Sequence, residues 1–185
     1  MKKLEKKWMS LMKKQSLILN NFIIILFFIS FSFSYSADTS SIYGKTEVID
    51  GDTIKIKDQN IRLAGIDAPE KKQLCKKPYL NLFIFTFSKS YPCGETSANN
   101  LKKFINNQII LCKIEEKKDF FKRYLGTCFK DKVNINSWLV KNGHALAFRK
   151  YSKKYLNEEL YAKNNKIGLW QGTFQMPWEW RKKNK

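Results

Sequence analysis

Alternating apolar and polar positions early in the chain predict short β-strands. In residues 54–57 two isoleucines alternate with two lysines, the period of two that is typical of a half-buried strand. Residues 46–49 and 61–66 on either side are also rich in strand-forming types. Turn residues separate or end these runs at positions 50–52, 58–60 and 67–69. We therefore expect a meander of three strands.

Farther along the chain the apolar period changes to three or four, which predicts helices. Residues 98–105 predict a first helix, residues 135–139 a short helix ended by Gly143, and residues 152–165 a last helix. Two more strands fit residues 108–115 and 125–130. Five strands with about three helices indicate an α+β protein with a small, closed or nearly closed barrel rather than a parallel α/β sheet.

The N-terminal residues 1–36 have the pattern of a signal peptide. Two lysines precede an apolar run at residues 22–33, and small residues follow, so we expect cleavage between Ser36 and Ala37. The run is shorter than the roughly 20 residues of a membrane-spanning helix, and an uncleaved membrane anchor is the alternative. We expect export to the periplasm or the cell exterior, with residues 37–42 as a flexible leader.

The chain is strongly basic, with a formal net charge of +19. Such an excess favours a polyanionic partner, either a nucleic acid or an acidic membrane or envelope surface. Compositional drift toward lysine is the competing explanation for much of it. In so lysine-rich a chain an arginine suggests a need for a planar, bidentate cation. The four arginines are Arg62, Arg123, Arg149 and Arg181.

All four cysteines follow the predicted signal peptide, and an even number in an exported protein indicates two disulfides. The spacing alone allows three connectivities. Pairing the two strands at residues 108–115 and 125–130 puts Cys112 opposite or diagonal to Cys128, which leaves Cys75 to pair with Cys93. A zinc site is disfavoured because the chain has a single histidine, His144, and no C-x-x-C pair.

Acidic side chains gather at the ends of the first three strands. Asp50 and Asp52 follow the first strand, and Asp67 and Glu70 follow the third. In a meander these ends lie near each other, so the four acids should converge. Their convergence in a basic chain suggests a bound hard cation such as Ca²⁺, which prefers oxygen ligands.

Two sequence blocks, V-I-D-G-D-T at residues 48–53 and I-R-L-A-G-I-D-A-P-E at residues 61–70, closely resemble the signature blocks of staphylococcal-nuclease-like proteins. A weaker likeness, D-F-F-K-R, occupies residues 119–123. The resemblance covers residues 43–172, with an insertion around residues 74–93, and leaves an aromatic and basic tail at residues 173–185. It implies a five-stranded β-barrel of the OB-fold type.

The resemblance also implies roles for individual residues. Asp52, Asp67 and the backbone carbonyl of Ala68 would bind Ca²⁺, and Asp50 would be a supporting carboxylate. Glu70 would be the general base or would orient the attacking water. Arg62 and Arg123 would hold the phosphate and stabilise the transition state. The implied function is Ca²⁺-dependent hydrolysis of DNA or RNA, and we expect the protein to act as a monomer.

Phe121 and Lys122 depart from the family pattern, which has Tyr-Gly there. A lost glycine could alter the turn that aims Arg123 if that position uses positive φ. Two alternatives to an active nuclease stay open: a catalytically weak or inactive OB-fold module that binds nucleic acid, and an envelope-attached factor. His144 has no role in the implied mechanism.

The inserted segment around residues 74–93 predicts no regular element, but residues 80–87 are strongly apolar, with three phenylalanines on alternate positions. One interpretation is a hairpin arm whose aromatic face packs on the barrel or on the first helix. The other is an exposed flap, held at its base by a Cys75–Cys93 disulfide, that contacts substrate bases or a membrane.

Overall fold

The computed structural model describes residues 8–9, 12 and 40–184. Apart from those three early residues, the predicted signal peptide and its cleavage site lie outside the described residues, as do residues 37–39 of the predicted leader. No helix in the described part of the chain is long and apolar enough to cross a membrane.

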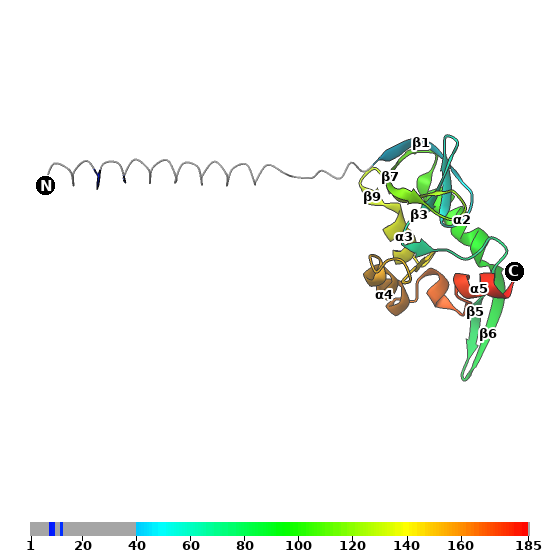
Figure 1. The fold of residues 1–185 in the computed structure, drawn as a ribbon. Coiled ribbons are helices and arrows are strands. Elements are labelled where there is room, and N and C mark those ends of the chain that lie inside the picture. Colours follow the sequence, from blue (N-terminus) through cyan, green and yellow to red (C-terminus); the bar gives the residue numbers. More distant parts are fainter. Residues whose placement is uncertain (1–7, 10–11, 13–39, 185) are drawn as a thin grey trace. The chain divides into compact units, whose positions relative to one another are not determined.

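Five strands form the barrel that the pattern predicts (Figure 1). They are β1 (Ser41–Val48), β2 (Thr53–Ile56), β3 (Gln59–Leu63), β7 (Ile109–Lys118) and β8 (Tyr124–Lys130). They are hydrogen-bonded in the order β3-β2-β1-β7-β8, and a parallel pairing of β3 with β8 closes the ring. A two-residue strand, β9 (Val133–Asn134), pairs antiparallel with the end of β8. The mixed five-stranded barrel confirms the predicted OB-fold type.

The described part of the chain holds four α-helices, one more than the sequence suggested. They are α2 (Cys93–Ile105), α3 (Ile135–Lys141), α4 (Leu156–Asn164) and α5 (Pro177–Lys183). A 3-10 turn at Gly168–Gln171 follows α4. The additional helix is α5, which begins at a proline, a residue that suits a first helical position, and which forms from the predicted tail.

The core fills the barrel and lies under α2 and α3. Alternation on β2 and β3 turns Ile54, Ile56, Ile61 and Leu63 inward, where all four are fully buried. Leu101 of α2 closes one side of this core. All residues of both buried clusters belong to the compact unit Thr39–Lys185, so this unit folds around its own core.

Both predicted disulfides are confirmed. Cys112 of β7 and Cys128 of β8 are direct register partners and are bonded inside the barrel. Cys75 and Cys93 are bonded at the start of α2.

The segment before α2 is regular rather than irregular, and it forms the hairpin that both interpretations allowed. It is an antiparallel pair of β5 (Leu74–Leu82) and β6 (Phe85–Pro92). Apolar and polar residues alternate in its distal half, but both faces are exposed there. The leader prediction also needs correction, because β1 pairs with β7 from Ser41 onward. Another short pair, β4 (Ile66–Asp67) with β10 (Leu146–Ala147), continues from β3.

Candidate active site

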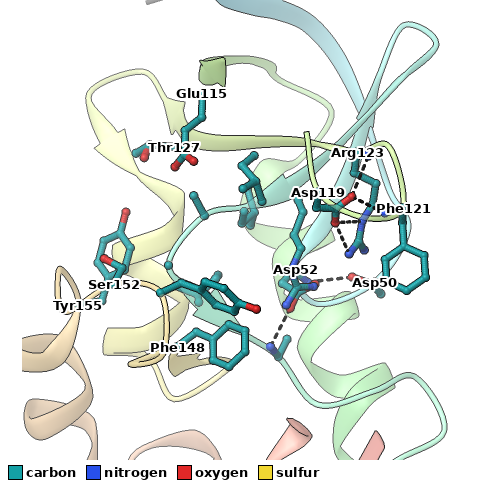
Figure 2. A pocket seen from close by; sticks show the side chains of 18 of the residues that line it. Asp50, Asp52, Glu115, Asp119, Phe121, Arg123, Thr127, Phe148, Ser152 and Tyr155 are labelled. Atoms are coloured by element: carbon teal, nitrogen blue, oxygen red, sulfur yellow. Dashed lines mark hydrogen bonds and ion pairs between the residues drawn. The ribbon is translucent and has the colours of Figure 1, made fainter. Parts of the chain in front are cut away.

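A cleft of about 1060 Å³ opens where the β1–β2 turn, the segment after β3 and the β7–β8 connection meet. Figure 2 shows Asp50, Asp52, Asp119 and Arg123 together on one side, with Phe121 beside them, and Phe148 and Tyr155 on the other side. Six of the predicted site residues line the cleft: Asp50, Asp52, Arg62, Ala68, Glu70 and Arg123. The seventh, Asp67, is reached through its contacts with Arg62.

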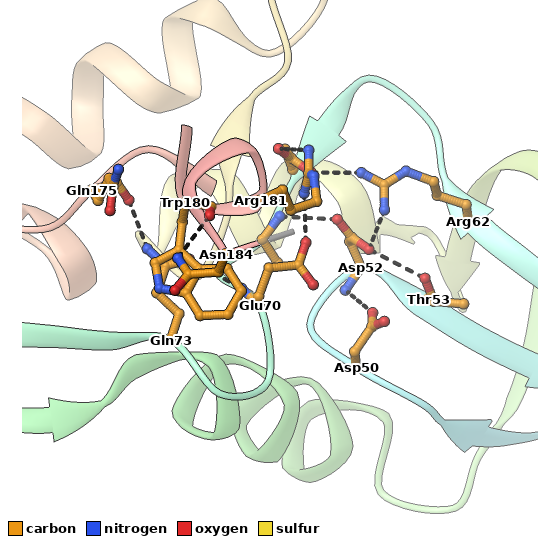
Figure 3. A network of polar contacts seen from close by, with 12 residues as sticks. Asp50, Asp52, Thr53, Arg62, Glu70, Gln73, Gln175, Trp180, Arg181 and Asn184 are labelled. Carbon is orange, nitrogen blue, oxygen red and sulfur yellow. Dashed lines mark hydrogen bonds and ion pairs between the residues drawn. The ribbon is translucent and has the colours of Figure 1, made fainter. Parts of the chain in front are cut away.

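One arginine bridges the two buried carboxylates of the site. Arg62 Nη1 donates to Asp52 Oδ1 and Nη2 donates to Asp67 Oδ1, both at 2.6 Å (Figure 3). The strand register explains this placement, since Arg62 on β3 pairs with Thr53 on β2, the residue that follows Asp52. Asp52 is 4% exposed and Asp67 is 0% exposed. Two carboxylates this deeply buried need cationic partners.

The Asp52 carboxylate is held from several directions. Its Oδ2 accepts from the backbone N–H of Ala68 at 3.0 Å, and its Oδ1 accepts from the Thr53 hydroxyl at 3.2 Å. The backbone N–H of Asp52 donates to Asp50 Oδ1 at 3.0 Å, so the Asp50 side chain fixes the turn that carries Asp52. Burial raises the pKa of Asp52 to about 7 despite the opposing charge of Arg62. A second positive charge near Asp52 would therefore be stabilising.

The C-terminal helix α5 supplies a second arginine that contacts Asp67. Arg181 on α5 donates from Nη2 to Asp67 Oδ2 at 2.8 Å and from Nη1 to Asp67 Oδ1 at 3.1 Å. Its Nη1 also donates to Glu70 Oε1 at 2.6 Å (Figure 3). Both oxygens of Asp67 are thus engaged by guanidinium groups, and the side chain of Glu70 is held in place at the mouth of the cleft.

Arg123 lies on the same side of the cleft as Asp50 and Asp52 (Figure 2), and a tight turn holds its side chain. Asp119 Oδ1 accepts from the backbone N–H groups of Phe121 and Arg123, and Asp119 Oδ2 accepts from Arg123 Nε at 2.8 Å. Burial would raise the pKa of Asp119, but the hydrogen bonds from Arg123 outweigh it and hold that pKa below its ordinary value. Lys122 has a φ of 61°, so this turn uses the left-handed region even though a lysine occupies it. Arg123 Nη1 also donates to Thr53 Oγ1 at 3.2 Å, which links it to the Asp52 side.

Comparison with known families decides the classification. The profile of the family described as "Staphylococcal nuclease homologue" matches residues 60–172, more than half of the chain. This chain belongs to the staphylococcal nuclease homologue family.

Named relatives of this nuclease homologue differ in length. "Succinoglycan biosynthesis protein ExoI" of Rhizobium meliloti is 33% identical over 70% of this chain and 65% of its own length. "Probable staphylococcal-like nuclease CAN3" of Oryza sativa is 31% identical over 71% of this chain, which spans only 30% of that relative. An "Uncharacterized endonuclease" of Escherichia coli O157:H7 is 29% identical over 82% of this chain and 92% of its own length.

The donor set of this nuclease homologue fits a hard cation in its chemistry. The carboxylates of Asp52 and Asp67 and the nearby Ala68 backbone supply oxygen ligands of the kind that Ca²⁺ prefers. Within the described residues, no three acidic, histidine or cysteine side chains already converge as a metal site. In this structure Arg62 and Arg181 are bonded to oxygens of Asp52 and Asp67 that a cation would use.

Sequence reasoning missed Arg181, which lies 114 positions from Asp67. The available signal was the arginine count, since Arg62, Arg123 and Arg181 all line the cleft. The fourth, Arg149, is paired with Glu159 and is not among the lining residues. His144, expected to have no catalytic part, lies against Trp138 with 5.4 Å between ring centroids and does not line the cleft.

Proposed function

We propose that this nuclease homologue is a Ca²⁺-dependent nuclease that hydrolyses phosphodiester bonds of DNA, RNA or both. The observation that carries the proposal is the bridge from Arg62 to two buried carboxylates, inside a cleft that also holds Glu70 and Arg123. A phosphodiesterase needs these parts: oxygen ligands for a cation, a carboxylate for the water, and donors for the phosphoryl oxygens.

In this proposal Asp52, Asp67 and the Ala68 carbonyl hold Ca²⁺, with Asp50 fixing the loop through the Asp52 backbone. Bound Ca²⁺ would neutralise charge on the phosphoryl group. Arg62 contacts Asp52 and Arg123 contacts Thr53, and their guanidinium groups would donate to phosphoryl oxygens as negative charge builds on them.

Glu70 accepts the proton of the attacking water in the same scheme. Its Oε1 accepts a hydrogen bond from Arg181 Nη1, a contact that limits the rotation of the side chain. A carboxyl group at the mouth of the cleft is placed to receive a proton from water entering with the substrate.

The aromatic wall supports a nucleic acid as the substrate. Phe121, Phe148, Tyr151 and Tyr155 line the cleft opposite or beside the charged residues. Rings in such a position can stack on unpaired bases, which contributes roughly 1–3 kcal/mol per base. The excess of lysine in the chain would favour any polyanion. The aromatic rings would add a preference for nucleic acids over other polyanions, because rings can stack on bases.

We propose further that the protein is exported and acts as a monomer outside the cytoplasm. The two disulfides support this location because such bonds persist in oxidising compartments. N-terminal sequencing of the protein recovered from its host tests this proposal. A chain that begins near Ala37 indicates cleavage, whereas a chain that keeps residues 1–36 indicates an uncleaved anchor.

The test is incubation of residues 39–185 with circular DNA and with RNA, in Ca²⁺ or in chelator. Asp52→Asn should lose both cleavage and Ca²⁺ binding, whereas Glu70→Gln should lose cleavage and still bind Ca²⁺ by calorimetry. Asp58→Asn is the matched control, because that carboxylate is exposed on the β2–β3 turn. A wild-type protein that binds nucleic acid tightly but never cleaves it would instead be a binding module.

A further inference from the structure

The β5–β6 hairpin carries an uncovered apolar end. Its turn is Phe83-Ile84; Phe83 is fully exposed and Ile84 is 88% exposed. Five other large apolar side chains of the arm are also exposed: Tyr79, Leu80, Leu82, Phe85 and Phe87. The packing interpretation of this segment is therefore wrong, and Figure 1 shows the hairpin extending away from the barrel.

The root of the hairpin, in contrast, is firmly attached. The Cys75–Cys93 disulfide ties β5 to the start of α2. Lys76 and Thr173 exchange two backbone hydrogen bonds, of 2.9 and 3.0 Å. A fixed root with a free end presents the apolar residues in one direction, so their exposure is a property of the fold.

The charges of the arm are all of one sign. No aspartate or glutamate occurs between Glu70 and Glu95, whereas this interval holds five lysines. Three of them lie on the hairpin behind its apolar end, where Lys77 pairs with Lys89 and Lys76 with Ser90. The arm thus has an apolar end followed by a basic collar.

We propose that the hairpin inserts its end into the surface of a membrane that contains anionic lipids. At roughly 3.3 Å per residue, the zone from the Leu80–Phe87 pair to the turn, apolar apart from the Asn81–Thr86 pair, is about 10 Å long. That length suits insertion into one leaflet, about 5–10 Å below the headgroups. The Lys77–Lys89 pair follows about three residues behind Leu80, and this places its ammonium groups at the level of lipid phosphates.

A nucleic acid fits the same end less well. Leu80, Leu82 and Ile84 have no aromatic face to stack on bases, and they gain chiefly by leaving water. An exposed, contiguous apolar patch at the end of an arm is typical of a membrane or partner contact. The basic collar then selects anionic lipid over neutral lipid. This inference is independent of the proposed nuclease activity.

The experiment measures sedimentation of residues 39–185 with vesicles of phosphatidylcholine alone or with 30% phosphatidylglycerol added. Binding to the anionic vesicles is expected, and Phe83→Ser/Ile84→Ser should weaken it at least about tenfold, because two inserted side chains are lost. Lys76→Gln/Lys77→Gln/Lys89→Gln should weaken binding to anionic vesicles only. The matched control is Tyr43→Ser/Ile109→Ser, which removes side chains of 63% and 64% exposure from the barrel and should bind as wild type.

Thermal unfolding checks that the variant with the altered turn is folded, since those side chains have nothing to unpack from. Wild-type protein that stays in the supernatant with anionic vesicles overturns the proposal. So does a variant of the turn that sediments like wild type. If that variant keeps vesicle binding but loses affinity for single-stranded DNA, the arm contacts substrate and the membrane assignment is wrong.

Discussion

Replacing Arg62 with lysine tests whether the bridge between the two buried carboxylates matters for chemistry. Arg62 uses two nitrogens on two acids, each contact being 2.6 Å long. A lysine has one compact ammonium group and cannot span Asp52 and Asp67 in the same way. One of the two carboxylates would then remain buried without its cation.

The magnitude follows from the contacts. Loss of one charge-assisted hydrogen bond is worth roughly 1.5–3 kcal/mol, which corresponds to about 10- to 150-fold in rate. Misplaced contacts to the phosphoryl oxygens add to this loss, so we expect kcat/KM to fall by about 10²–10³. The free energy of unfolding should fall by about 1–3 kcal/mol in the metal-free protein.

The assay is cleavage of a fluorescent oligonucleotide at saturating Ca²⁺, with urea unfolding measured in parallel. Arg149→Lys is the matched control, because Arg149 also pairs with a buried acid, Glu159, but is 68% exposed and lies outside the cleft lining. It should leave kcat/KM unchanged and alter stability by less than about 1 kcal/mol. Near-normal turnover by Arg62→Lys would refute the transition-state role.

Three further predictions concern the rest of the domain. Cys112→Ala/Cys128→Ala opens a loop with a sequence separation of 16 and should lower the free energy of unfolding by about 3 kcal/mol in urea titrations. Burial lowers the pKa of His144 to about 4, so the folded protein excludes a proton that the unfolded chain binds below about pH 6.5. The His144 contribution to stability should therefore fall by about 2 kcal/mol between pH 7 and pH 5, opposite in sign to the contribution of Asp52, so the test is the difference in slope between wild type and His144→Gln. Arg181→Gln frees Asp67 Oδ2, while Oδ1 keeps its bond from Arg62, and should tighten Ca²⁺ binding about tenfold in calorimetry; an unchanged Kd would contradict competition between Arg181 and the cation.

The barrel and its acidic corner were predictable because local pattern decides them. Period-two alternation fixes which faces of β2 and β3 are buried, and the turn at residues 50–52 reverses the chain. Once that register is set, Arg62 must lie opposite Thr53 and near Asp52. The convergence of these residues needs no long-range information beyond the meander itself.

Arg181 and the hairpin were not predictable in the same way. The contact of Arg181 with Asp67 depends on how α5 docks, and nothing in residues 173–185 encodes a partner more than 100 positions away. In the hairpin, apolar and polar residues alternate as they do in a half-buried strand, yet the apolar face is exposed, so the pattern does not indicate what that face contacts. The positive φ of Lys122 was foreseen only as a condition attached to the family pattern.

The residues at the root of the hairpin connect the site to the hairpin and to the segment that carries Arg181. Gln73 is fully buried, and its side chain accepts from the backbone N–H of Glu70 at 3.2 Å while donating to the carbonyl of Gln175 at 2.7 Å. One amide thus fixes the backbone of Glu70 and holds the segment that leads into α5 and Arg181. A buried amide whose oxygen and nitrogen are both hydrogen-bonded restricts the arrangement of its surroundings, because any other arrangement leaves a donor or an acceptor without a partner. The hairpin therefore has two parts with different roles. Its end can change without disturbing the fold, whereas the geometry of Glu70 depends on the residues at its root.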